Sequence, residues 1–251
     1  MPYQILLIGG SDSSGLAGVQ ADKSICNHYY INPSIVTTSV TVQDNDNFYN
    51  RFDQDPGFIY DSICHILDNY EIDYVKIGML ANLNICEQVH KALINRTIKV
   101  IIDPVIRSSS GAKLLDDDAL SFVKKNIIPM AYLITPNVIE AEILTDLTIN
   151  DISSMKLACK LIKQTGVKNI VLKGGHLDDE NFATDILYDE SELFKLEQSL
   201  RCKSRLRGSG CKFASAVACN LILGNDLKKS FFISKKLITS FFFQEQNLAV
   251  N

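Results

Sequence analysis

A regular alternation of short apolar runs with longer helical patterns is the feature that most restricts how this chain can fold. Six apolar runs predict strands buried on both faces, at residues 5–8, 35–42, 74–77, 100–102, 132–134 and 170–172. Helices are predicted at 18–30, 57–70, 83–95, 116–125, 138–145, 151–165, 211–223 and 227–246. This order predicts an α/β fold in which helices flank a mainly parallel central sheet.

A further pair of short runs, 186–188 and 193–196, flanks Asp189-Glu190-Ser191 and predicts a small hairpin at one edge of the sheet. The chain has 251 residues, of which 46% are hydrophobic and 22% charged, and no low-complexity linker divides it. We therefore expect a single domain over residues 1–251.

Composition also excludes several classes of function. The net charge of −4 gives no electrostatic reason to expect nucleic acid or an anionic membrane surface as partner. No apolar run reaches membrane-spanning length, and the N-terminus has no signal-peptide pattern. Seven cysteines without Cys-x-x-Cys spacing argue against a disulfide framework or a structural zinc site. We expect a cytoplasmic protein.

The segment Arg207-Gly208-Ser209-Gly210-Cys211-Lys212 leads directly into a predicted helix. Glycines and a serine before a helix can direct several backbone N–H groups at one point, where the helix end adds partial positive charge. Such an anion hole suits phosphoryl transfer, so the segment favours a small-molecule kinase. The chain has no Gly-x-x-x-x-Gly-Lys-[Ser/Thr] run, which disfavours a P-loop kinase.

Polar clusters follow each of the six predicted strands. Ligands of open α/β sheets bind beyond the carboxyl ends of parallel strands, so these clusters should meet at one edge. They are Gly9-Gly10-Ser11-Asp12-Ser13-Ser14-Gly15, Gln43-Asp44, Lys76-Ile77-Gly78-Met79, Asp103-Pro104-Val105, Thr135-Pro136-Asn137 and Lys173-Gly174-Gly175-His176.

Together with Gly208-Ser209-Gly210-Cys211, these motifs resemble the ribokinase-like fold, and within it the hydroxymethylpyrimidine and phosphomethylpyrimidine kinases of thiamine biosynthesis. They follow the family's order from residue 9 to about residue 219. The resemblance implies a three-layer α/β/α domain that uses ATP and Mg²⁺ to phosphorylate 4-amino-5-hydroxymethyl-2-methylpyrimidine and then its monophosphate. It also implies a homodimer.

For the acceptor, the resemblance implies a pocket that holds a flat aminopyrimidine. The amide of Gln43 offers both a donor and an acceptor to the ring edge, and Met79 offers an adaptable apolar wall. Asp22 is expected near the amino group, with Gly10 and Val42 also in the pocket. From the residues alone, Asp22 fits a solvated helix position, Met79 ordinary core and Gln43 a strand-end cap equally well.

For the nucleotide, the resemblance implies contacts from Asp103, Asn137 and Lys173, with Asn137 and Glu140 holding Mg²⁺ directly or through water. Mg²⁺ prefers oxygen ligands and is commonly held through phosphates with one or two carboxylates. The Asn-x-x-Glu spacing also predicts a helix-capping box, and both roles are compatible. Lys173 supplies a compact positive charge to the triphosphate, or else reaches solvent from a strand end.

The resemblance gives catalysis to Gly208, Ser209, Gly210 and Cys211. The backbone donors stabilise developing charge, and Cys211 is the candidate base for the acceptor hydroxyl. A helix N-terminus flanked by Arg207 and Lys212 should lower the pKa of this thiol below its ordinary value. A cysteine at a helix start is also consistent with a small packing residue.

Four positions depart from the family pattern. Arg207 stands where a histidine is frequent, Leu16 where a glycine is common, Lys212 where threonine is frequent, and Arg107 where a small or apolar residue is usual. These departures keep two alternatives open, a pyridoxal kinase of the same fold and a catalytically weak pyrimidine-binding relative.

Overall fold

A computed structural model describes residues 3–44, 47–108, 110–175, 182–192, 194–200 and 207–248. Over these ranges the predicted α/β architecture is confirmed. The strands form one nine-stranded sheet in the order β3-β2-β1-β4-β5-β6-β7-β8-β9. Their bounds are β1 Gln4–Asp12, β2 Asn32–Gln43, β3 Phe48–Asp53, β4 Tyr74–Ile77, β5 Lys99–Ile102, β6 Leu133–Ile134, β7 Asn169–Leu172, β8 Phe182–Tyr188 and β9 Phe194–Leu200.

The central strands β2-β1-β4-β5-β6-β7 pair in parallel, as the alternation of strands and helices predicts. Antiparallel strands lie at both edges, β3 beside β2 and the β8–β9 hairpin beside β7. The hairpin is longer than predicted, and Leu193 of the predicted second run lies outside the described residues.

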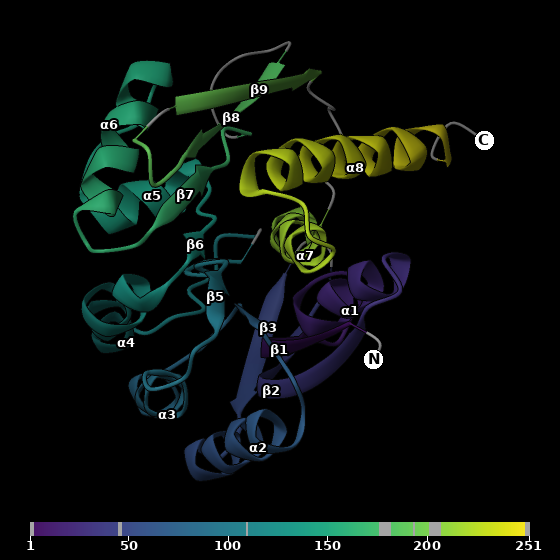
Figure 1. Cartoon of the computed structure of the whole chain (residues 1–251), viewed down its shortest axis with the longest axis vertical. Coiled ribbons are helices and arrows are strands. Elements are labelled where there is room, and N and C mark those ends of the chain that lie inside the picture. Colours follow the sequence, from purple (N-terminus) through teal and green to yellow (C-terminus); the bar gives the residue numbers. More distant parts are fainter. Residues whose placement is uncertain are drawn as a thin grey trace.

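Helices cover both faces of the sheet, giving three layers (Figure 1). One face packs against α1 Gly18–His28, α7 Ser209–Ile222 and α8 Leu227–Leu248. The other packs against α2 Pro56–Asn69, α3 Leu83–Leu93, α4 Asp117–Phe122, α5 Val138–Thr145 and α6 Ile152–Lys163. Alternate residues of β1 divide between the two cores, because side chains of a strand point to opposite faces.

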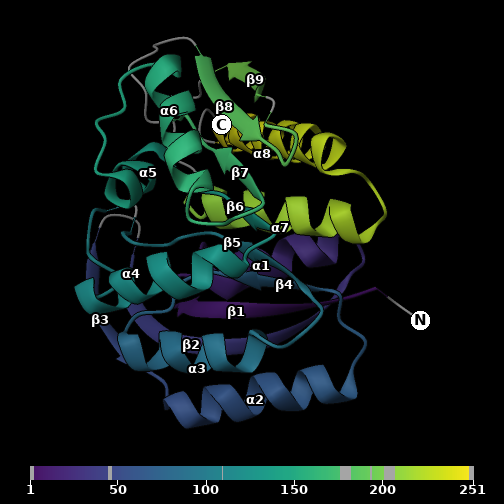
Figure 2. The same cartoon turned by 60° about the vertical axis from the view of Figure 1, so that its left-hand side comes forward.

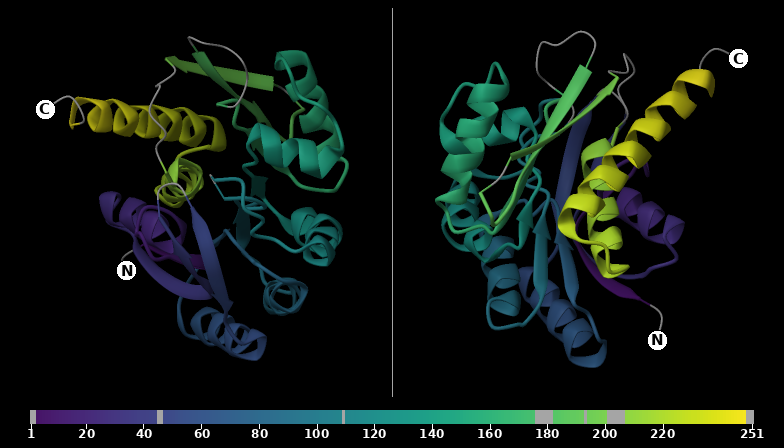
Figure 3. Two further views of the ribbon diagram at one scale, coloured as in Figure 1. Left: turned by 180° about the vertical axis from the view of Figure 1, so that it is seen from behind. Right: turned by 45° about the horizontal axis from the view of Figure 1, so that its top comes forward.

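Local sequence explains where several helices begin. Asp55 caps α2 by accepting a hydrogen bond from the Phe58 N–H at 2.8 Å, and Pro56 occupies the first helical position. The predicted 116–125 helix is α4 continued by one π-helical turn, Val123–Ile127. Figures 2 and 3 show α7 lying between α1 and α8, so α7 packs both on the helix that follows it and on a helix from the other end of the chain.

The sequence prediction missed β3. The segment interleaves Asn50, Arg51 and Asp53 with aromatic residues, and it lies at a sheet edge where Tyr49 and Phe52 remain 62% and 71% exposed. Without a buried apolar run, periodicity gave no strand signal.

No helix within the described ranges is both long and apolar enough to cross a membrane.

Candidate active site

The segment predicted to form an anion cradle lies at the first turn of α7. The helix begins at Ser209, two residues earlier than predicted, so Ser209 and Gly210 belong to the helix and Gly208 is its N-cap. The first intrahelical bond runs from the Lys212 N–H to the Gly208 carbonyl at 2.9 Å. The N–H groups of Ser209, Gly210 and Cys211 therefore have no acceptor within the helix and are available to an anion.

Glycine is required at position 208 for two reasons. Its φ is +72°, in the left-handed region, and a Cβ there would lie 2.1 Å from the Leu16 carbonyl oxygen. The loop before α1 therefore packs directly on the start of α7. This contact fixes the direction of the first helical turn.

A buried ion pair lies against the cradle. Lys173 Nζ is 2.9 Å from Asp103 Oδ1, and a Cβ on Gly210 would lie 3.0 Å from the same ammonium. Burial opposes ionisation of Asp103, but Lys173 and Lys76 outweigh it and hold the pKa of that carboxyl below its usual range. The structure thus brings together Gly210, Lys173 and Asp103, which the sequence predicted at one site. His176, at the end of the same motif as Lys173, lies outside the described residues.

The predicted low pKa of Cys211 is wrong. Burial raises the pKa of this thiol to about 12, and the nearby Asp103 and Asp22 raise it further against the lowering effect of Lys76. Lys212 lies over the Phe241 ring, 6.0 Å from its centroid, so this flanking cation faces α8. Lys212 is next to Cys211 in the sequence, which suggested that its charge would lower the pKa of the thiol. In the folded chain this charge lies against α8 instead.

Cys211 nonetheless lies among the predicted site residues. Its thiol lies close enough to Asp103 and to the backbone of Gly18 for each of them to shift its pKa. It belongs to the same helical turn as Gly210. Cys211 is therefore adjacent both to the cradle and to the Lys173–Asp103 ion pair.

Asn137 and Glu140 form the predicted capping box at the start of α5. Asn137 Oδ1 accepts from the Glu140 N–H at 2.9 Å, and Glu140 Oε2 accepts from the Asn137 N–H at 2.8 Å. Burial raises the pKa of Glu140 to about 8, with Lys173 lowering it and Asp103 raising it. Asn137 also pairs with Lys173 through a parallel β-bridge, which places the box beside the cradle region.

These oxygen donors fit a hydrated Mg²⁺. A buried carboxylate with too little positive charge around it gains from a divalent cation, and the raised pKa of Glu140 is the sign of that shortage. Within the described ranges, no cluster of three or more His, Cys, Asp or Glu side chains is arranged to hold a metal alone.

Gly10 and Met79 are in direct contact, as predicted for the acceptor pocket. A Cβ on Gly10 would lie 2.9 Å from Met79 Sδ, so glycine lets the end of β1 approach this side chain. Gln43 Nε2 donates to Thr41 Oγ1 at 2.9 Å, and the Gln43 backbone is tied to the Ser13 hydroxyl. The amide of Gln43 is thus held at the end of β2 beside the loop that follows β1.

Val42 differs from its neighbour. It is 55% exposed, whereas Gln43 is half-buried, and the register of β2 against β3 shifts between these two residues. The contribution of Val42 to the acceptor pocket stays a prediction.

Asp22 is buried where α1, β4 and α7 meet. It is 1% exposed, and its carboxylate accepts from Lys76 Nζ at 2.8 and 3.0 Å and from Ser215 Oγ at 2.8 Å. The expected contact with a substrate amino group does not match this geometry. Asp22 instead links α1 to β4 through Lys76 and to α7 through Ser215. Ser215 lies one helical turn beyond Cys211.

Lys76 is the residue of this network that sequence reasoning left without a role. Burial alone would lower its pKa, but the Asp22 carboxylate outweighs that effect and raises it above the usual range, so Lys76 carries its charge in the core. The sequence signal for a buried lysine was its position between two apolar residues of a predicted strand, in Val75-Lys76-Ile77.

Two of the remaining departures from the family pattern lie in loops. The Leu16 side chain is exposed, and its carbonyl contacts Gly208. Arg107 is exposed and donates to the Gly111 carbonyl at 3.1 Å.

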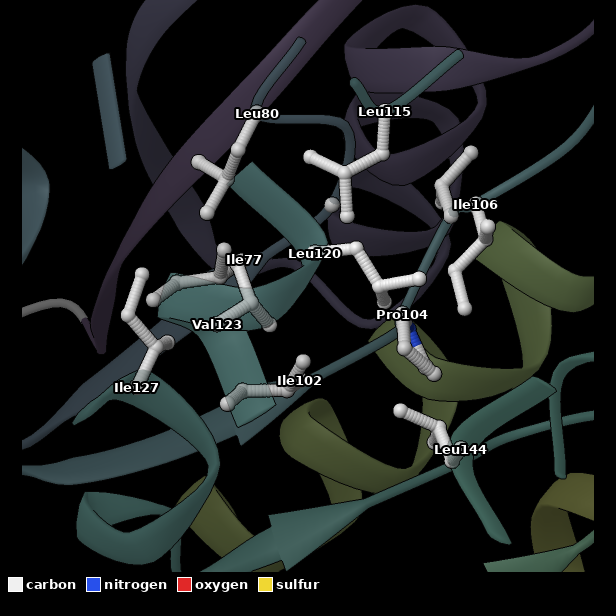
Figure 4. A pocket seen from close by; sticks show the side chains of 12 residues that line it. Ile77, Leu80, Ile102, Pro104, Ile106, Leu115, Leu120, Val123, Ile127 and Leu144 are labelled. Atoms are coloured by element: carbon white, nitrogen blue, oxygen red, sulfur yellow. The ribbon is translucent and has the colours of Figure 1, made fainter. Parts of the chain in front are cut away.

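A small apolar cavity of about 20 Å³ is lined in part by Pro104 and Val105 (Figure 4). Its volume is about that of one water molecule, and apolar side chains surround it. It is too small and too apolar to be the acceptor pocket. Its lining includes Ile77, Leu80, Ile102, Ile106, Leu115, Leu120, Val123, Ile127 and Leu144.

The strand order, the helix layers and the cradle at the start of α7 define a ribokinase-like α/β protein, a class that includes small-molecule kinases. Residues 12–250 match the sequence model described as phosphomethylpyrimidine kinase. The chain belongs to this family, as the motifs predicted.

Individual relatives agree with this assignment. The chain is 37% identical over 235 residues to the hydroxymethylpyrimidine/phosphomethylpyrimidine kinase of Aquifex aeolicus, covering 93% of this chain and 92% of that one. A phosphomethylpyrimidine kinase structure from Clostridium difficile superposes with a TM-score of 0.83 at 33% identity, covering 95% and 98% of the two chains. Bacillus subtilis pyridoxal kinase in an ADP complex superposes with a TM-score of 0.86 at 30% identity, covering 94% and 90%.

Proposed function

We propose that this chain transfers the γ-phosphoryl group of ATP to the hydroxymethyl oxygen of 4-amino-5-hydroxymethyl-2-methylpyrimidine, and then to the resulting monophosphate. One observation carries the proposal: Lys173 Nζ lies 3.0 Å from the position of a Cβ on Gly210, so a cation and the free amides of a helix start converge on one point. Family membership supplies the substrate class.

On the nucleotide side, Lys173 neutralises phosphate charge and the amides of Ser209, Gly210 and Cys211 bind the transferring group. Asp103 holds the Lys173 ammonium in place at 2.9 Å. Asn137 and Glu140 are the residues that would hold Mg²⁺, which supplies charge neutralisation at the phosphates when bound. The ADP complex of the Bacillus subtilis relative supports nucleotide binding by this fold.

On the acceptor side, the amide of Gln43 pairs with the pyrimidine edge, and Met79, fitted against Gly10, forms the apolar wall. Cys211 faces the acceptor hydroxyl. Because burial raises the pKa of its thiol to about 12, Cys211 can take up the hydroxyl proton only as a thiolate, the form that the nearby charge of Lys76 favours. A loose transition state requires little proton removal before the new P–O bond forms.

Pyridoxal phosphorylation is the second candidate. The superposition on Bacillus subtilis pyridoxal kinase favours it, since the fold and much of the chain are shared. The predicted pairing of Gln43 with an aminopyrimidine edge favours the pyrimidine instead.

Two further parts of the proposal concern assembly and compartment. The family resemblance implies a homodimer, which light scattering of the purified protein tests. Each cysteine in the described residues is a free thiol, as expected for a protein of the reducing cytoplasm.

Steady-state kinetics with three acceptors test the function. ADP formation is measured with the hydroxymethylpyrimidine, its monophosphate and pyridoxal separately, each at saturating Mg²⁺-ATP. We expect the highest kcat/KM with the pyrimidines. A higher kcat/KM with pyridoxal would overturn the substrate assignment, and turnover of none would indicate a binding protein.

A further inference from the structure

Arg207, directly before the cradle, has a largely buried side chain whose Nε–H donor is unused. Its side chain is only 12% exposed, and within the described residues its buried Nε has no hydrogen-bond partner. A guanidinium carries five N–H donors in a rigid planar fork. Burying such a group without acceptors is costly unless a ligand provides them.

The charged partner of Arg207 is Asp12, at the end of β1. The closest approach, Nη2 to Oδ2, is 3.5 Å, which is long for a hydrogen bond. The Asp12 carboxylate already accepts from the Ser14 N–H at 3.0 Å, the Ser14 hydroxyl at 2.7 Å and the Ala17 N–H at 3.0 Å. Asp12 is therefore used mainly to shape the loop before α1, and it leaves the guanidinium under-partnered.

Other cations around the start of α7 are differently placed. Lys173 and Lys76 are each held by a buried aspartate, at 2.9 and 2.8 Å, and Lys212 lies over an aromatic ring of α8. Arg207 lies between the end of β1 and the start of α7, the two segments that border the proposed acceptor and the cradle. At this position the guanidinium of Arg207 can bind a second anion beside the cradle.

We propose that Arg207 binds the phosphate group of a phosphorylated acceptor and so selects the substrate of the second phosphoryl transfer. The inference rests on the proposed function. The first acceptor offers a neutral hydroxyl at this point, whereas the second offers a phosphate monoester beside the γ-phosphate of ATP. Two anions held close together require an additional cation, and a planar guanidinium matches phosphate oxygens in bidentate geometry.

The second phosphoryl transfer needs no general base, because the attacking phosphate oxygen carries no proton. An oxygen of the dianionic acceptor phosphate donates an electron pair to the γ-phosphorus, forming the new P–O bond. The bond from that phosphorus to the β–γ bridging oxygen breaks, and ADP leaves with its electron pair. Arg207 orients the attacking phosphate and offsets its charge, and it exchanges no proton.

The test compares kcat/KM for the hydroxymethylpyrimidine and for its monophosphate in the wild type, Arg207→Gln and Arg207→Lys. Loss of a charge-assisted bidentate contact should lower kcat/KM for the monophosphate by about 10- to 100-fold in Arg207→Gln. The value for the unphosphorylated alcohol should change by less than about threefold. Arg207→Lys keeps the charge but not the fork, so its loss should be smaller and again confined to the monophosphate.

The ratio between the two acceptors separates recognition from folding, because a misfolded fraction lowers both values equally. Arg96→Gln, which removes a surface ion pair with Asp68, is the matched control and should leave the ratio unchanged. If Arg207→Gln does not fold, Arg207→Lys carries the comparison. Equal losses for both acceptors, or a raised KM for ATP with both, would overturn the role of Arg207. Failure of the wild type to use either pyrimidine would instead overturn the proposed function.

Discussion

Replacing Gly210 with alanine should stabilise the fold and damage catalysis at the same time. Gly210 is the second residue of α7 and its φ is not positive, so its backbone accepts alanine without strain. Alanine is favoured over glycine in helices by about 0.5–1 kcal/mol, and we expect a free energy of unfolding equal to or above that of the wild type by up to about this amount.

The added methyl group would lie where the transferring phosphoryl group is proposed to bind. Its Cβ would be 3.0 Å from Lys173 Nζ, closer than the 3.4 Å at which ordinary contact begins, so the ammonium must retreat by about 0.4 Å. That ammonium is held by Asp103 at 2.9 Å, and the methyl would also crowd the amide donors. Loss of one such donor costs about 10²- to 10³-fold in kcat, and we expect a fall of this order.

Gly57→Ala is the matched control. Gly57 is also the second residue of its helix, α2, where a Cβ would lie 3.1 Å from the Asp55 carboxylate, remote from the cradle. Urea denaturation and kcat with the hydroxymethylpyrimidine are measured for both variants. An unchanged kcat in folded Gly210→Ala, or an equal loss in Gly57→Ala, would refute the cradle.

Three further predictions address the buried groups of the site. Cys211→Ala should lower kcat by about 100-fold with little change in the Kd for ATP, and an unchanged kcat would remove its role at the acceptor hydroxyl. Because the folded pKa of Glu140 is about 8 and its ordinary value 4.5, folded protein binds more protons between these pH values, so stability falls as pH rises through this window. Relative to Glu140→Gln, the metal-free wild type should lose about 1 kcal/mol of unfolding free energy per pH unit between pH 6 and 8. Unfolding free energies that change equally with pH in the two proteins would contradict this. Lys76→Met should destabilise by about 3–5 kcal/mol by leaving the buried Asp22 carboxyl without its cation, and adding Asp22→Asn should recover much of the loss in urea denaturation; no recovery would argue against this cause.

The elements that the sequence predicted well are those in which burial and periodicity agree. The central strands are continuous apolar runs, and α5 and α6 begin at the capping residues Asn137 and Asp151. The start of α7 was placed two residues late, because Ser209 and Gly210 have low helix propensity and the contact of Gly208 with the Leu16 carbonyl is not visible in sequence.

For the site, motif order predicted which residues would gather but not how each side chain is used. Gly10 meets Met79, and Lys173 meets Asp103, because all four lie at or just beyond the carboxyl ends of parallel strands. The partners of Asp22 are distant in sequence, so its buried pairing with Lys76 could not be predicted from spacing. The pKa of Cys211 depends on burial and on the directions of neighbouring charges, which only the folded chain defines.

Direct product analysis tests the central claim most sharply. The protein is incubated with ATP, Mg²⁺ and 4-amino-5-hydroxymethyl-2-methylpyrimidine, and the products are followed by ³¹P NMR in the wild type and in Gly210→Ala. We predict that the wild type forms the pyrimidine monophosphate and then the diphosphate in step with ADP, and that the variant forms both far more slowly. ADP accompanied only by inorganic phosphate, or equal product formation by the two proteins, would contradict phosphoryl transfer at the start of α7.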